Sequence, residues 1–261
     1  MPDIENTETI ARKLLPIIYV LDTSGSMEGD RIAAVNLAMS ETMEVLKDVS
    51  KNNPSAELKI GVLKFDSGSQ WITDSGFVFM EDFFWNDLKA GGLTDLGSAL
   101  KELDDKMSRK KFLNSEVGYK VPVLIFMSDG QPTDDYKSAL KKINASNKWF
   151  KASTKIAIAV GDDADTEVLK EIVGNSEAVI RVNDLETLKR LIKVASVTAS
   201  MIGSKSRTDS DAQSEILNSI QQDAGVKLDK SDDVSPKPAP APDPEPDTFD
   251  ADDPWGDDKW D

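Results

Sequence analysis

The chain has 261 residues, and its 47 acidic against 31 basic residues give a formal net charge of −16. A surface this negative repels phosphate backbones and anionic lipids, so we expect neither nucleic acid nor a membrane as a partner. Histidine and cysteine are absent, which excludes disulfides, thiolate nucleophiles, serine–histidine–aspartate triads and the usual zinc ligands. Any bound metal must therefore be held by oxygen, as Mg²⁺, Mn²⁺ and Ca²⁺ prefer.

Composition divides the chain into three parts. The first residues carry acids where a secretion signal carries bases, and no apolar run approaches the roughly 18 residues of a membrane span. We therefore expect a cytoplasmic protein, with an N-terminal extension over residues 1–14, a folded domain over 15–202 and a disordered tail over 203–261. The tail holds 16 of the acidic and 6 of the basic residues, a net of −10 against −6 for the rest, and it is too polar to form a core.

Apolar strands alternate with amphipathic helices along the folded part. In chain order, we expect strands at 17–21, 60–65, 70–73, 77–80, 121–127, 155–160 and 178–182, and helices at 31–49, 96–107 and 134–150 and from Asp165 and Asp184. The two short segments 70–73 and 77–80 read as a hairpin or an edge strand. Strands that are apolar on both faces and separated by helices predict an α/β fold with a mostly parallel sheet covered on both sides.

Oxygen-bearing side chains follow the ends of these strands. In parallel sheets, ligands bind outside the carboxyl ends of strands, where the strand order reverses. Two aspartates would supply negative charge there, and three hydroxyls would complete an oxygen site for one divalent cation, with Mg²⁺ favoured and Mn²⁺ or Ca²⁺ as alternatives. The candidate ligands are Asp22, Ser24 and Ser26 in an Asp-x-Ser-x-Ser motif, Thr94 in the Gly-Gly-Leu-Thr-Asp loop, and Asp129 in Ser-Asp-Gly.

These five positions, in this order, match the metal-ion-dependent adhesion site of the von Willebrand factor A (vWA) family, and residues 15–201 resemble that domain. The segments LPIIYVLDTSGSMEGDRI, GGLTDLGSAL, MSDGQPTDD and AVGDDADTEVLKEI are most similar to its TerY-like branch of bacterial proteins associated with tellurium resistance. The resemblance implies a Rossmann-like sheet with one antiparallel edge strand. It also implies direct coordination by the hydroxyls, with the aspartates often acting through water, and one open position that takes a carboxylate from a protein partner.

The same resemblance implies a non-enzymatic adaptor in a stress-response system, with a protein kinase and a metal-dependent phosphatase as partners. Two alternative functions and one alternative role for a residue stay open. A phosphatase of the haloacid dehalogenase type also places an aspartate at the end of its first strand, but it needs a second carboxylate two residues later, where this chain has Ser24. The metal site could instead be vestigial in a structural subunit. Asp95 is expected to cap the helix at 96–107, with a ligand role as the alternative.

Two tryptophans stand in the acidic tail, where nothing around them can form a core. Trp255 and Trp260 therefore resemble a docking motif for a partner, the alternative being a tail that only solubilises the protein. The tail also ends in many carboxylates behind a proline-rich spacer at 236–246, which favours an extended chain. A tail carboxylate could thus occupy the open metal position, either in the same molecule or in a neighbouring one.

Overall fold

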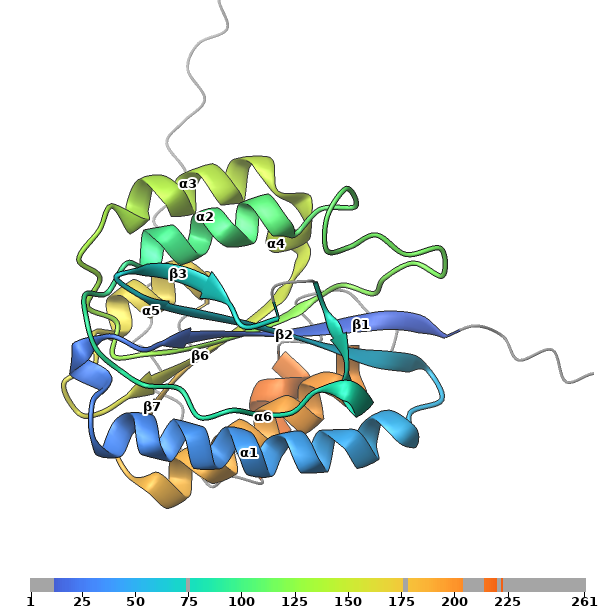
Figure 1. Ribbon diagram of the computed structural model, residues 1–261, viewed down its shortest axis with the longest axis horizontal. Coiled ribbons are helices and arrows are strands. Elements are labelled where there is room, and N and C mark those ends of the chain that lie inside the picture. Colours follow the sequence, from blue (N-terminus) through green and yellow to red (C-terminus); the bar gives the residue numbers. More distant parts are fainter. Residues whose placement is uncertain (1–11, 74–75, 176–177, 204–213, 220–221, 223–261) are drawn as a thin grey trace, which may run out of the picture. The chain divides into compact units, whose positions relative to one another are not determined.

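The computed structural model describes residues 12–73, 76–175, 178–203, 214–219 and 222, and Figure 1 shows how their elements are arranged. Its seven-stranded sheet has the order β3-β2-β1-β5-β6-β7, with β4 also pairing with β2. The parallel strands are β1 (Lys13–Asp22), β2 (Ala56–Asp66), β5 (Val123–Ser128), β6 (Thr154–Val160) and β7 (Val179–Val182). Every residue of β5 and β6 is buried, as expected for a sheet covered on both faces. The predicted α/β fold is confirmed.

The antiparallel edge of the sheet is formed by two short strands. β3 (Gly68–Trp71) and β4 (Val78–Phe79) each pair with β2, at different places along it. The predicted edge strand near Trp71 is therefore confirmed. Trp71 is buried and packs edge-on against Phe112, which closes this end of the core.

Helices cover both faces of the sheet. In Figure 1, α2 (Leu96–Lys106) and α3 (Tyr136–Ser146) lie on one side of the strands, and α1 (Asp30–Lys51) and α6 (Leu185–Gly203) lie on the other. α5 (Thr166–Val173) joins β6 to β7, and the 3₁₀ turns are η1 (Gly25–Met27) and η2 (Met80–Asp82). Within the described residues, no helix combines the length and the apolar character needed to cross a bilayer.

One predicted helix is divided in two. The continuous helix expected over 134–150 is wrong, because the chain breaks at Asn147 between α3 and α4 (Lys148–Ala152). The Asn147 Oδ1 accepts a hydrogen bond of 2.9 Å from the Phe150 amide and so caps α4. Its Nδ2 donates to the main-chain oxygens of Asp104 and Met107 at 3.1 and 3.2 Å, which ties the break to the end of α2.

Both ends of the folded part extend slightly past the expected limits. β1 begins at Lys13 and α6 ends at Gly203. Residues 214–219 are helical, and Ile216 and Leu217 are buried with 0% and 3% exposure as members of the hydrophobic core. The sequence also allows a short, weak helix near residues 212–222, within a tail otherwise expected to be disordered, and the structure buries the two adjacent apolar side chains of that segment. Trp255 and Trp260 lie outside the described residues.

Candidate metal centre

The candidate ligands gather where the strand order of the sheet reverses. β1 lies between β2 and β5, and the register that pairs Leu21 with Met127 brings the last residues of β1 and β5 to the same edge. Asp22 is the last residue of β1, and Asp129 follows the last residue of β5. In Figure 1 this edge is at the left, where the blue loop joins β1 to α1. The position is the one at which doubly wound sheets bind ligands.

The loop after β1 brings one carboxylate and two hydroxyls together. Asp22 is only 1% exposed, and its Oδ1 accepts a hydrogen bond of 2.8 Å from the Ser24 amide. The Oγ atoms of Ser24 and Ser26 lie 3.0 Å apart, where the η1 turn begins directly after Ser24. Two hydroxyl oxygens at this separation can serve as ligands of one ion.

The loop that carries Thr94 packs directly on the first loop. The Gly25 amide donates to the Gly92 carbonyl at 3.1 Å, and a Cβ on Gly25 would lie 3.3 Å from that same oxygen. Thr94 is buried, and its backbone is held on both sides by Thr133, which accepts from the Thr94 amide at 3.0 Å and donates to the Thr94 carbonyl at 2.9 Å. The backbone of the third hydroxyl-bearing residue of the predicted set is therefore fixed, in a loop that packs on the loop of the first two.

Asp129 has a carboxylate that the protein satisfies only in part. The residue is 2% exposed, and its Oδ1 is buried without a hydrogen-bond partner among the described residues. Its Oδ2 lies 3.5 Å from Nη1 of Arg31. A buried carboxylate oxygen with no partner is unfavourable by about 1–3 kcal/mol or more, and a cation at this point would supply the missing interaction. The residues present thus fit a divalent cation.

Burial also perturbs the carboxyl group of Asp22. Its desolvation raises the pKa, and the negative charge of Asp129 raises it further. Hydrogen bonds from Ser128 and Ser24 oppose this shift, and the Ser128 Oγ donates to Asp22 Oδ2 at 2.5 Å. Two buried carboxylates at the same edge of the sheet repel each other, and a positive charge between them would stabilise their ionised forms.

The donor set is unusual in composition. Three of the five candidate ligands are neutral hydroxyls. Within the described ranges, no group of three carboxylates is placed to hold a metal ion. Oxygen donors of this kind suit hard divalent cations. Neutral ligands leave most of the charge of the ion uncompensated, which favours a further anion on it.

Sequence reasoning missed the supporting residues. Ser128 stands in the recognised Ser-Asp-Gly motif but was given no role, and it orients Asp22 while accepting from the Gly130 amide at 2.8 Å. The sequence pattern places Arg31 only at the start of a helix, and no local pattern indicates that it reaches Asp129. Contacts of this kind depend on tertiary structure.

Asp95 stands at the N-cap position of α2, as predicted, but its side chain makes no capping hydrogen bond to the helix. Its two carboxylate oxygens accept from the Gly68 amide at 2.8 Å and from the Thr133 hydroxyl at 3.2 Å, so it braces the Thr94 loop instead. The amino end of α2 is capped from another loop by Asp134, which accepts from the amides of Gly97 and Ser98 at 2.8 and 2.9 Å.

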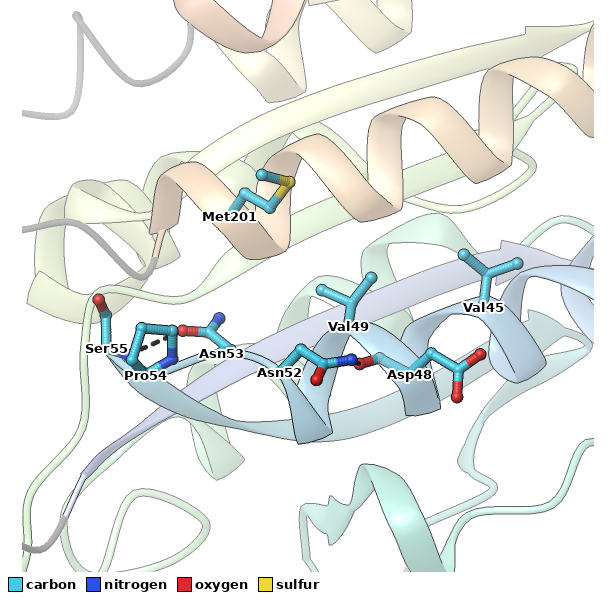
Figure 2. A pocket seen from close by; sticks show the side chains of 8 residues that line it. All are labelled: Val45, Asp48, Val49, Asn52, Asn53, Pro54, Ser55 and Met201. Atoms are coloured by element: carbon cyan, nitrogen blue, oxygen red, sulfur yellow. Dashed lines mark hydrogen bonds between the residues drawn. The ribbon is translucent and has the colours of Figure 1, made fainter.

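A cavity of about 500 Å³ lies at the opposite edge of the sheet. It opens beside the turn that leads into β2, where parallel strands begin rather than end, so it is separate from the candidate metal centre. Figure 2 shows that apolar side chains of α1 and α6 face it across a gap. Its lining residues are Val45, Asp48, Val49, Asn52, Asn53, Pro54, Ser55 and Met201.

Solved structures of low sequence identity share this fold. Pilus adhesin SpaC from Lactobacillus rhamnosus GG, in its open conformation, matches with a TM-score of 0.55 and 13% identity over 73% of this chain and 30% of that chain. Proximal thread matrix protein 1 from the mussel byssus gives 0.50 and 20% over 70% and 47%. A von Willebrand factor type A structure from Catenulispora acidiphila gives 0.50 and 16% over 73% and 43%. The chain thus spans less than half the length of each of these three proteins.

These identities support a common fold and nothing finer. No curated protein gives a significant sequence match. The sequence profile of the von Willebrand factor type A domain matches residues 17–194, which is well over half of the 261 residues and spans all five candidate ligands. The chain therefore belongs to the von Willebrand factor type A domain family.

Proposed function

We propose that this chain is a non-enzymatic, metal-dependent protein-interaction module. Its divalent cation is held by Asp22, Ser24, Ser26, Thr94 and Asp129, and it accepts a carboxylate of a partner protein. The observation that carries this proposal is the buried Oδ1 of Asp129, which no described residue satisfies, at the same sheet edge as the buried carboxylate of Asp22. When bound, the ion supplies an electrophilic position for the carboxylate of the partner. The chain itself supplies a rigid oxygen cradle on three loops.

We infer that Mg²⁺ is the physiological cation, with Mn²⁺ and Ca²⁺ as alternatives. The Oγ atoms of Ser24 and Ser26 are only 3.0 Å apart, which suits a small ion with short oxygen distances of about 2.1 Å. Ca²⁺ takes more ligands at longer distances. The loop after β1 and the loop that carries Thr94 are joined by a backbone hydrogen bond, which resists such an expansion of the site.

Isothermal titration of the full chain with each cation tests the metal site. We expect Mg²⁺ binding by the wild type and at least roughly tenfold weaker binding by Asp22→Ala and Ser24→Ala, because coordination requires both oxygens. Ser40→Ala is the matched control, since Ser40 is an exposed serine on α1 away from the site. A wild type that binds no cation, or a Ser24→Ala variant that binds as well as the wild type, would show that the site is vestigial.

The phosphatase alternative has little support from the geometry. Both carboxylate oxygens of Asp22 accept hydrogen bonds, from Ser24 and Ser128, and the residue is 1% exposed, so it is poorly placed as a nucleophile. The position of the general acid is held by Ser24. We expect no hydrolysis of an aryl phosphate with Mg²⁺, and turnover that disappears in Asp22→Ala would contradict the binding-module proposal.

The finer biological role rests on the resemblance of the sequence to the TerY-like branch. We propose a cytoplasmic adaptor in a bacterial stress response, with a protein kinase and a metal-dependent phosphatase as partners and the tail tryptophans Trp255 and Trp260 as a second docking point. Affinity capture with wild-type and Asp22→Ala protein, with Mg²⁺ or EDTA, tests this role. Partners captured equally in all four conditions would not depend on the metal site.

A further inference from the structure

Arg31, the second residue of α1, reaches into the candidate metal centre. Its Nη1 donates to the main-chain oxygen of Ser26 at 3.2 Å and lies 3.5 Å from Asp129 Oδ2. Its Nη2 pairs with Oδ1 of Asp163, on the loop after β6. The guanidinium thus touches two candidate ligand residues, and its side chain is still 28% exposed.

The place of the guanidinium is shaped by the fold. Gly161 follows β6 with φ of +103°, and a Cβ on it would lie 2.7 Å from Nη2 of Arg31. A Cβ there would overlap the present position of the guanidinium, so the glycine leaves the space that Arg31 occupies. Asp163, by contrast, is 66% exposed on its side chain. Its ion pair with Arg31 is therefore weak and easily replaced.

A positive charge in this place has two opposite consequences. It attracts Asp129 and so competes with the cation for the same carboxylate. It also attracts any anion that docks on the cation, because a guanidinium binds carboxylates through paired, charge-assisted hydrogen bonds. A residue that served the fold alone would not move cation binding and anion binding in opposite directions.

We propose that Arg31 is a second anion-binding group of the metal centre and selects partners that present two adjacent carboxylates. One carboxylate takes the open position on the ion, and the other replaces Asp163 on the guanidinium. This inference rests on the metal-dependent function proposed above.

The surroundings of Arg31 make this selection depend on the ion. A crevice of about 230 Å³ borders Arg31 and gives access to it, and its rim carries Asp30, Asp162 and Asp184. These carboxylates repel an acid that lacks the attraction of the cation, so the acidic pair binds only after the ion is in place.

The cation arm of the test is a Mg²⁺ titration of the full chain. Arg31→Gln should bind Mg²⁺ about two- to fivefold more tightly, since it removes one positive charge from a partly exposed position beside Asp129. Arg109→Gln is the matched control, because it makes the same change in net charge at an exposed residue that lines a different cavity. Thermal unfolding of each variant verifies that it is folded.

The anion arm uses two capped peptides at saturating Mg²⁺, one with an Asp-Asp pair and one with Asp-Asn, with binding followed by NMR shifts. The wild type should prefer the Asp-Asp peptide about three- to tenfold, and Arg31→Gln should lose this preference. Asp163→Asn should tighten Asp-Asp binding when Arg31 is present and leave it unchanged in the Arg31→Gln background, as a double-mutant cycle would show.

Two results would overturn the inference while leaving the proposed function intact. One is a preference for Asp-Asp that persists in Arg31→Gln, and the other is weaker binding of both Mg²⁺ and peptide in that variant, which would mean a merely structural role. Failure of the proposed function looks different, because the wild type itself would then bind no Mg²⁺, and both proposals would be rejected.

Discussion

At Asp129, a buried carboxylate oxygen has no hydrogen-bond partner in the part of the chain that the structure describes, so this residue is unfavourable to the ion-free fold. Asp129→Ala should therefore leave the free energy of unfolding in EDTA unchanged or raise it by about 1 kcal/mol, because an unsatisfied buried acceptor disappears. The same change should abolish the stabilisation by Mg²⁺. Denaturant unfolding with and without Mg²⁺ measures both effects. Asp163→Ala, which removes the exposed carboxylate on Arg31, is the control and should keep the Mg²⁺ response.

The outcome that contradicts this account is a loss of more than about 1 kcal/mol in EDTA for Asp129→Ala, well above the typical worth of a partly exposed ion pair. It would mean that the contact between Asp129 and Arg31 matters more to the fold than the buried oxygen does.

Asp22 makes cation binding depend on pH. Burial raises the pKa of Asp22 above the ordinary value of about 4. Protonated Asp22 therefore stabilises the ion-free protein at low pH, and that contribution is lost as the pH rises through the pKa of the folded state. The cation needs the ionised form. We therefore expect the Mg²⁺-induced rise in Tm to be largest near about pH 7.5 and to shrink toward about pH 5, because protons compete for a carboxylate with a raised pKa. A Mg²⁺ effect that grows toward acid pH would exclude this coupling.

At the scale of elements, the loop after β5 is held against the residue that caps α5. The Asp165 amide donates to the Asp129 carbonyl at 2.6 Å. Gly130 has φ of +75°, and a Cβ on it would lie 2.2 Å from the Asp165 oxygen. Gly130→Ala should destabilise the fold by roughly 2–4 kcal/mol, through left-handed backbone strain plus a clash, and should weaken Mg²⁺ binding by moving Asp129.

The control for this variant is Gly174→Ala, where φ is +73° but nothing lies within 4 Å of the added Cβ. It should lose only about 1 kcal/mol from backbone strain, with unchanged Mg²⁺ affinity. Urea unfolding and Mg²⁺ titration of the pair separate the clash from the strain, and equal losses in the two variants would reject the clash.

Local patterns predicted most elements to within a few residues, since strands that are apolar on both faces and helices with periodic apolar residues carry their signal in the chain itself. The division between α3 and α4 was not predicted, because Asn147 makes its decisive bonds with residues about 40 positions away. The side-chain partners of Asp95 were not predicted for the same reason, because Gly68 begins β3 and Thr133 lies in the loop after β5.

At the scale of the whole molecule, two parts of the chain after α6 can be tested separately. One is the helical segment 214–219, which packs on the core, and the other is the acidic stretch 223–261. A chain that ends at Gly203 loses the buried side chains Ile216 and Leu217, so its free energy of unfolding should fall by roughly 3–6 kcal/mol at most. A chain that ends at Gln222 keeps both side chains and should unfold like the full protein. Equal stability of the two truncated chains would show that these side chains contribute nothing.

The chain ending at Gln222 also tests whether the acidic tail occupies the metal centre. It lacks the acids of residues 223–261 while keeping the buried helical segment. If a tail carboxylate competes for the open position, the truncated chain should bind an acidic peptide more tightly than the full chain at equal Mg²⁺, because a tethered competitor has been removed. Unchanged affinity would show that the tail does not occupy the open position, and docking elsewhere would remain as the role proposed for it.

The sequence by itself determined the class of fold and the chemistry of the candidate centre. Without histidine or cysteine only oxygen can hold a metal, and residue types in three loops supply that oxygen. Only the tertiary structure decided how the centre is supported. Ser128 donates to Asp22 across 106 residues of chain, and Arg31 reaches Asp129 across 98. Contacts over such separations leave no local periodic signal, because they are created by strand order and packing rather than by neighbouring residues.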